Sequence, residues 1–129
     1  MSLRNNGLMK VFFAGAAISP ARLVKFDTDD RTVIQGAAAA DAVFGVSDAA
    51  PISAAASGER VDVAIGGIVP VTYGGTVTRG QLLMSDSTGR AITATAAAGT
   101  NVRTAGVAMV SGVVGDLGDI SLTPGSFQG

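Results

Sequence analysis

Three carboxylates stand together in the stretch DTDDR, where Asp27, Asp29 and Asp30 fall within four consecutive residues. Such a cluster could supply hard oxygen ligands to Ca²⁺ or Mg²⁺. However, the stretch lacks the central glycine and the distal glutamate of a helix-loop-helix calcium loop, and the adjoining Arg31 would repel a cation. We therefore interpret these carboxylates as solvated turn residues and expect no metal site.

Nucleophilic chemistry is restricted by composition. The chain has no His and no Cys, which removes imidazole bases, thiolate nucleophiles, disulfides and zinc-thiolate sites. Neither Lys10 nor Lys25 has a Ser three residues before it, so no serine-lysine dyad is indicated. The segment GVSDA, residues 45–49, lacks the second glycine of a nucleophile elbow, and no phosphate-binding glycine motif is present.

Acid–base catalysis would need carboxylates in different environments. The candidates that could converge are Glu59, Asp62, Asp116 and Asp119. Nothing in the neighbouring sequence would raise the pKa of one of them over another, as this chemistry requires. We expect no catalytic residue and no cofactor, and we predict that the protein is not an enzyme.

Charge and composition narrow the class of partner. Nine Lys and Arg balance ten Asp and Glu, without a basic run that would bind nucleic acid or an anionic membrane. With one Tyr, five Phe and no Trp, the chain offers few stacking platforms for sugars or bases. The 47% of apolar residues and the mean hydropathy of +0.44 favour burial between chains.

The elements that would position these residues are short strands. Eighteen Gly and four Pro interrupt runs rich in Val, Ile and Thr, which predicts an all-β fold. The expected strands are 11–17, 23–26, 32–35, 43–47, 60–65, 68–73, 82–85, 92–95, 103–110 and 119–123. The Ala-rich residues 36–45 are expected to form at most one or two helical turns or an ordered loop, and Gly66 and Gly67 a two-residue hairpin turn if the flanking strands are antiparallel.

The N-terminus allows two interpretations. Residues 11–18 form an apolar stretch after early positive charges, as in a signal peptide. The stretch is short, contains Gly15 and is followed by Pro20, which favours a strand that ends in a turn. We expect an N-terminal arm over residues 1–10 and a single β-rich domain over 11–129, and no segment approaches the roughly 18 apolar residues of a membrane span.

One segment occurs nearly twice: LVKFDTDDRTVI, residues 23–34, resembles LLMSDSTGRAIT, residues 82–93. Leu, Asp and Arg coincide at an offset of 59, and Gly89 is expected to supply a positive φ where Asp30 stands in the other copy. Gly-Val and Asp-x-x-apolar matches continue downstream. The pattern predicts pseudo-repeats of about 11–67 and 68–125, unless the two hairpins converged independently on the same turn residues.

From Thr78 to Thr123 the order of motifs is G-x-L-L, S-D-x-x-G-R, I-T-x-T, an Ala-rich linker, A-G-V-A-M and D-I-S-L. This order resembles the small decoration or cement proteins of tailed phage heads. The resemblance implies a compact, β-tulip-like barrel or sandwich that forms homotrimers on the outer capsid surface. It also implies bridging of major capsid proteins and no catalytic residues.

On this resemblance we expect a structural virion protein, made in the host cytoplasm, that stabilises the head. The polar arm residues Leu3, Arg4, Asn5 and Asn6 are candidate capsid contacts, because such an arm can order on meeting a partner. A frayed terminus is the alternative. The rival function is a secreted or surface β-module that binds a small ligand or glycan, which N-terminal cleavage near Ala17 or Ala21 would favour.

Overall fold

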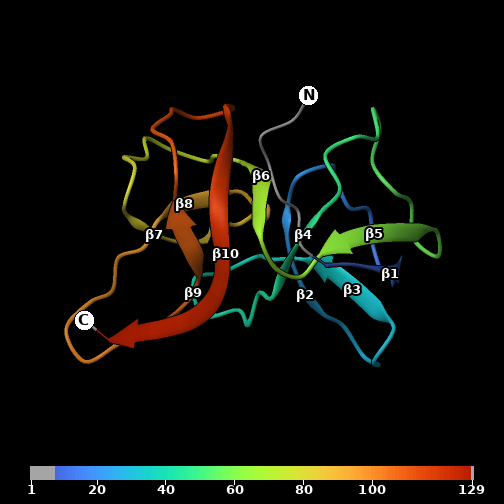
Figure 1. Cartoon of the computed structure of the whole chain (residues 1–129). Helices are drawn as coiled ribbons and strands as arrows, with labels where there is room; N and C mark the ends of the chain where they lie inside the picture. Colours follow the sequence, from blue (N-terminus) through green and yellow to red (C-terminus); the bar gives the residue numbers. More distant parts are fainter. Residues whose placement is uncertain (1–7, 129) are drawn as a thin grey trace.

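A computed structural model describes residues 8–128 and shows the expected small all-β fold (Figure 1). All ten expected strands form, with shifts at their ends. They are β1 (Met9–Ala14), β2 (Leu23–Phe26), β3 (Thr32–Gln35), β4 (Gly45–Ser47), β5 (Arg60–Ala64), β6 (Ile68–Thr72), β7 (Leu82–Ser85), β8 (Ala91–Thr93), β9 (Asn101–Ala108) and β10 (Leu117–Gln128). Strand β1 begins at Met9, two residues earlier than expected, because Met9 and Lys10 pair with Ala64 and Val63.

The first five strands form a closed barrel, which we call the first half (residues 9–64). Around the barrel the order is β1-β3-β2-β4-β5, and β1 closes it by pairing antiparallel to β5 and parallel to β3. Because alternate residues of a strand point to opposite faces, β1, β2, β3 and β5 each contribute apolar side chains to the interior. A cluster of buried residues fills it: Phe12, Ala14, Ile18, Val24, Val33 and Val63.

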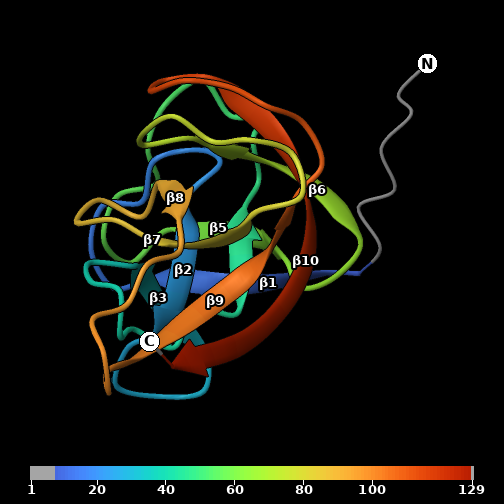
Figure 2. The same ribbon diagram turned by 90° about the vertical axis from the view of Figure 1, so that its left-hand side faces the viewer.

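The last five strands form a second sheet in the order β6-β10-β9-β7-β8, which we call the second half (residues 68–128). Strand β6 pairs antiparallel to β10, and a single parallel bridge joins Tyr73 to Ala91. The long β10 curves across β9, with a register shift between Leu122 and Gly125 (Figure 2). A second buried cluster takes residues from both halves, including Leu23, Val46, Leu83 and Ile120, so the halves share a core.

The expected hairpin at Gly66 and Gly67 is wrong. Strand β5 pairs with β1 and β4, whereas β6 pairs with β10, so the two strands on either side of these glycines belong to different sheets. Gly67 has a φ of +88°, and its carbonyl accepts a hydrogen bond from Leu122 N of β10. The two glycines therefore carry the chain from one half to the other instead of reversing it.

The Ala-rich segment after β3 is an ordered loop, one of the two expected outcomes. Asp41 accepts hydrogen bonds from Ala37 N and Ala38 N at 2.7 and 3.0 Å, and its carboxylate forms an ion pair with Lys25 at 2.9 Å. Burial alone would raise the pKa of Asp41, but the hydrogen bond from Ala37 and the contact with Lys25 outweigh burial and lower it. A single carboxylate thus holds a segment whose alanines would otherwise favour a helix.

Matching positions of the two halves make matching contacts. Ala21 and Gly80 both have a positive φ, and so do Gly58 and Gly115. The two isolated antiparallel bridges also correspond: Ile18 pairs with Ala55 in the first half, and Val77 with Gly112 in the second. The strand orders also correspond, because the second sheet, read from β6 across the Tyr73–Ala91 bridge, has the order β6-β8-β7-β9-β10, as β1-β3-β2-β4-β5 in the first half. These correspondences support our proposal that the halves are copies of one unit.

The hairpins of the two halves differ at their tips. Phe26 pairs with Val33 across six intervening residues, whereas Ser85 pairs with Ala91 across five. The expectation that Asp30 shares the positive φ of Gly89 is wrong, since Ala21 is the only non-glycine residue with positive φ in the described part of the chain. The extra residue gives the first hairpin a different turn, which does not require that conformation.

Candidate contact surfaces

The carboxylates with possible chemistry are used to hold turns. Asp29 Oδ1 accepts a hydrogen bond from Arg31 N at 2.9 Å, and this bond lowers the pKa of Asp29. The side chain of Asp27 lies against the α-carbon of Gly15, in a space that a Cβ would fill. Within residues 8–128 no group of three or more acidic side chains is placed to hold a metal ion.

The four carboxylates considered for acid–base chemistry do not converge. Glu59 accepts from Ala56 N at 2.6 Å, and Asp116 accepts from Val113 N at 2.9 Å, in corresponding turns of the two halves. Asp62 is exposed on β5. Asp119 lies with Asp116 near Tyr73, where burial first and then these two carboxylates raise the pKa of the phenol. Glu59 and Asp62 therefore lie on the first half and Asp116 and Asp119 on the second, and Glu59 and Asp116 hold turns.

Exposed apolar side chains lie on the loop between β9 and β10 and on Leu117, the first residue of β10, where no catalytic or binding motif was predicted. We call this surface the β9–β10 patch; its exposed apolar residues are Met109, Val110, Val113, Val114 and Leu117. The side chains are 40 to 58% exposed, although apolar side chains usually lie inside. The available signal was Val113 and Val114 between Gly112 and Gly115, because valines are unusual in a turn bounded by glycines.

The β9–β10 patch is held rigidly by Tyr73. The buried Tyr73 hydroxyl donates to Val110 O at 2.8 Å, and its main chain bonds to Asp116 O and Gly115 N. The ring fills the space above Gly112 and Gly118, where any Cβ would overlap with it. The loop therefore presents its valines in one fixed arrangement, which lowers the entropy lost when a partner binds.

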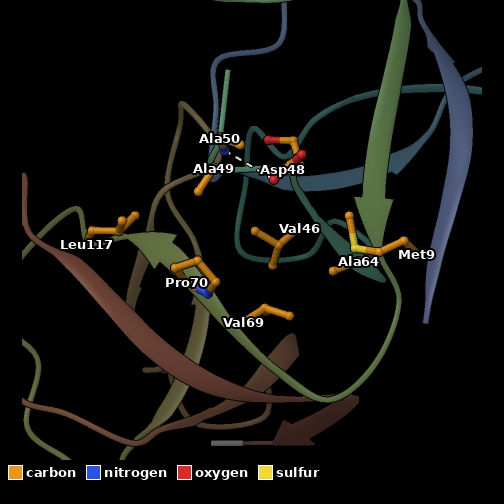
Figure 3. Close-up of a pocket in the computed structure, with 10 residues that line it drawn as sticks. Met9, Val46, Asp48, Ala49, Ala50, Ala64, Val69, Pro70 and Leu117 are labelled. Atoms are coloured by element: carbon orange, nitrogen blue, oxygen red, sulfur yellow. Dashed lines mark hydrogen bonds between the residues drawn. The ribbon is translucent and has the colours of Figure 1, made fainter. Parts of the chain in front are cut away.

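A hollow of about 340 Å³ adjoins this patch where the two halves meet (Figure 3). Leu117 forms one wall, and the other apolar side chains come from both halves: Met9, Val46, Ala64, Val69 and Pro70. Asp48 is its charged member, and its Oδ1 accepts from Ala50 N at 3.1 Å. No aromatic side chain lines the hollow, so it offers no stacking platform for a sugar.

A second hollow of about 380 Å³ lies on the first half, between the turn after Ile18 and the loop that precedes β5. It also lacks an aromatic lining residue, and its charged members are Asp48, Glu59, Arg60 and Asp62.

The outward side of β1 is also apolar, and it begins at Met9, which lines the first hollow. Val11 and Phe13 are 54% and 38% exposed, because the odd-numbered residues of this strand face outward from the barrel. Leu8, which precedes the strand, is 63% exposed. The arm residues Leu3, Arg4, Asn5 and Asn6, which precede this strand, lie outside the described residues. No helix in residues 8–128 is long and apolar enough to span a membrane.

Two comparisons with known proteins, one of sequence and one of structure, found a match. The sequence matches the family of phage cement proteins over residues 4–116. The fold is similar to the crystal structure of the head fiber gp8.5 N base in bacteriophage phi29, with a TM-score of 0.56 and 17% identity over 90% of this chain and 93% of that one. A search of curated proteins found no match.

Proposed function

This chain belongs to the phage cement protein family, and we propose on this premise that it is a structural protein of a phage head and not an enzyme. The finer proposal is that it forms a homotrimer on the outer capsid surface and bridges neighbouring major capsid proteins. The family match over residues 4–116 carries the proposal. The rigid, exposed β9–β10 patch supports it, because a large apolar surface on an ordered loop is typical of a protein contact.

The mechanism is multivalent clamping. Each subunit contributes a modest contact surface, and three subunits held together bind the capsid with an avidity far above that of one contact. This mechanism needs rigid surfaces more than it needs a deep pocket. The closed barrel of the first half and the pinned loop of the second half suit it, since neither must rearrange to present its exposed apolar side chains.

The test combines sedimentation with a stability assay on undecorated heads. Purified protein should sediment as a trimer, bind the heads and raise the temperature at which they rupture. A protein that sediments as a monomer and leaves head stability unchanged would refute the proposal. Deleting residues 2–7 should lower occupancy on heads if Leu3, Arg4, Asn5 and Asn6 form a latch, and unchanged occupancy would show that the arm is not one.

A further inference from the structure

The two halves are joined by a turn of the second half that packs on the first. Leu23 N donates to Gly89 O at 2.7 Å, and Arg22 Nη1 and Gln35 Nε2 both donate to Thr88 O, at 3.0 and 3.1 Å. Leu23 is completely buried beneath this turn. The approach is close enough that a Cβ on Gly89 would lie 2.9 Å from Leu23 O.

This contact is made in one direction only. The corresponding turn of the first half, residues 27–31, is exposed along its whole length. Leu82 corresponds to Leu23 but is 44% exposed. Two units related by a two-fold axis would make the contact twice, so this contact is heterologous. It leaves the turn of the first half and the receiving surface of the second half available for another copy.

The available turn and the available surface are chemically complementary. The turn carries the carboxylates of Asp29 and Asp30, while the surface around Gln81, Leu82 and Thr93 adjoins the exposed Arg79. Position 79 corresponds to Pro20, and the filled surface of the first half has its cation at Arg22 instead, so the cation lies at a different position on the two surfaces. Because the loop of this hairpin, residues 27–32, is one residue longer than residues 86–90 and lacks a glycine, we expect its carboxylates rather than its carbonyls to accept the hydrogen bonds.

We propose that turn 27–31 of one copy docks on the surface formed by Arg79, Gln81, Leu82 and Thr93 of the next copy. The inference rests on the proposed self-association and names the contact that produces it. A heterologous contact that closes forms a ring. A ring of three copies contains six halves. Within each chain the turn of the second half would dock on the first half, and between chains the turn of the first half would dock on the second half of the next copy, which gives three contacts of each kind.

Disulfide trapping tests this contact without background, because the natural chain has no Cys. Thr28→Cys and Leu82→Cys are prepared as single variants and together in one chain, all at exposed positions. Under mild oxidation the mixed single variants should give a covalent dimer, and the double variant a covalent closed trimer. Each single variant alone is the control and should stay uncrosslinked, since a disulfide requires α-carbons within about 7 Å.

Charge reversal provides the second readout. Asp30→Arg and Arg79→Glu should each weaken self-association roughly tenfold in sedimentation, and the double variant should recover it. Asp62→Arg, an equal charge change on exposed β5, should have no such effect. A trimer that forms without the 28–82 crosslink and tolerates both reversals would overturn this contact and leave the proposed function standing. A natural chain that stays monomeric would overturn this contact, and one that also leaves head stability unchanged would overturn the proposed function as well.

Discussion

At the scale of single residues, the recurring Asp of the hairpins is the clearest structural determinant. Asp86 accepts hydrogen bonds from the main-chain N–H groups of Thr88 and Arg90 and forms an ion pair with the Arg90 guanidinium at 2.9 Å. Burial by itself would raise the pKa of Asp86, but these hydrogen bonds outweigh burial and lower it. The Asp that begins the second hairpin therefore stabilises a turn.

Replacing Asp86 with Asn should lower the free energy of unfolding by about 2 kcal/mol at pH 7, the usual effect of losing hydrogen bonds to a charged group. Because the folded-state pKa is lowered, this stabilisation is present above the ordinary Asp pKa of about 4 and is lost as the pH falls through the folded value. Urea unfolding at several pH values checks this.

The difference between natural chain and variant should shrink below about pH 4. Asp62→Asn, on exposed β5 and outside the proposed contact between copies, is the control and should change stability by less than about 0.5 kcal/mol. A difference for Asp86→Asn that stays constant from pH 7 to pH 2 would contradict a role for the ionised carboxylate.

At the scale of elements, the two halves place different side chains at one corresponding site. In the second half Tyr73 lies against Gly118, where a Cβ would overlap with the phenol ring. The corresponding positions of the first half hold Ala14 and Val61. The second half thus combines a large side chain with a glycine, which has no side chain, whereas the first half has two smaller side chains at these positions. Packing interiors to crystal-like density makes such size changes interdependent.

The size exchange predicts a non-additive pair of substitutions. Gly118→Val should destabilise the protein by about 3 kcal/mol through overpacking, and Tyr73→Ala by about 4 kcal/mol through the cavity that it leaves. Their combination imitates the first half and should be less destabilising than the sum by more than about 1 kcal/mol. A double-mutant cycle in urea measures this; additive losses would show that the two positions do not share one space.

A second pair of substitutions separates backbone strain from docking. Gly89 and Gly99 have nearly equal φ values of +76° and +78°, but only Gly89 has neighbours within 4 Å of a built Cβ. Gly99→Ala should therefore cost about 1 kcal/mol through the left-handed backbone alone. Gly89→Ala should cost at least about 1 kcal/mol more, because its methyl group would meet Leu23 O. Equal losses in thermal unfolding would argue against a tight contact between the halves.

The sequence predicted elements better than their connections. Alternation in Val61, Val63 and Val71 marks half-buried strands, because burial on one face is a local property of a strand. Gly66 and Gly67 were mistaken for a hairpin because glycine permits both a reversal and a crossing, and only long-range pairing with β10 decides between them. The β9–β10 patch could not be predicted from the sequence either, since the exposure of Val113 and Val114 is evident only when the loop is folded onto Tyr73.

At the scale of the whole molecule, the exposed apolar side chains lie on different elements of two otherwise similar halves. The loop of the first half that corresponds to the β9–β10 loop is mostly alanine and serine, with Ile52 as its exposed large apolar side chain. The β9–β10 patch is thus not required by the common fold. An apolar surface present in only one copy is better explained by a partner than by folding.

Val114→Asp should therefore lower occupancy on undecorated heads roughly tenfold or more while leaving unfolding within about 0.5 kcal/mol of the natural chain. Ile52→Asp introduces the same change on the corresponding loop of the first half and should retain binding. Occupancy is measured by gel densitometry of sedimented heads. Equal binding by both variants would place the capsid contact elsewhere than the β9–β10 patch.

Among residues 8–128, no strand of one half pairs with a strand of the other, and this arrangement has a consequence for synthesis. The first barrel has all its partners once Ala64 leaves the ribosome, and chains emerge at only about 5–20 residues per second. During the following seconds its Leu23 N–H has no Gly89 to bind. A barrel of roughly 60 residues that closes at this stage is only marginally stable, since Leu23 and Val46 are covered only when the second half arrives.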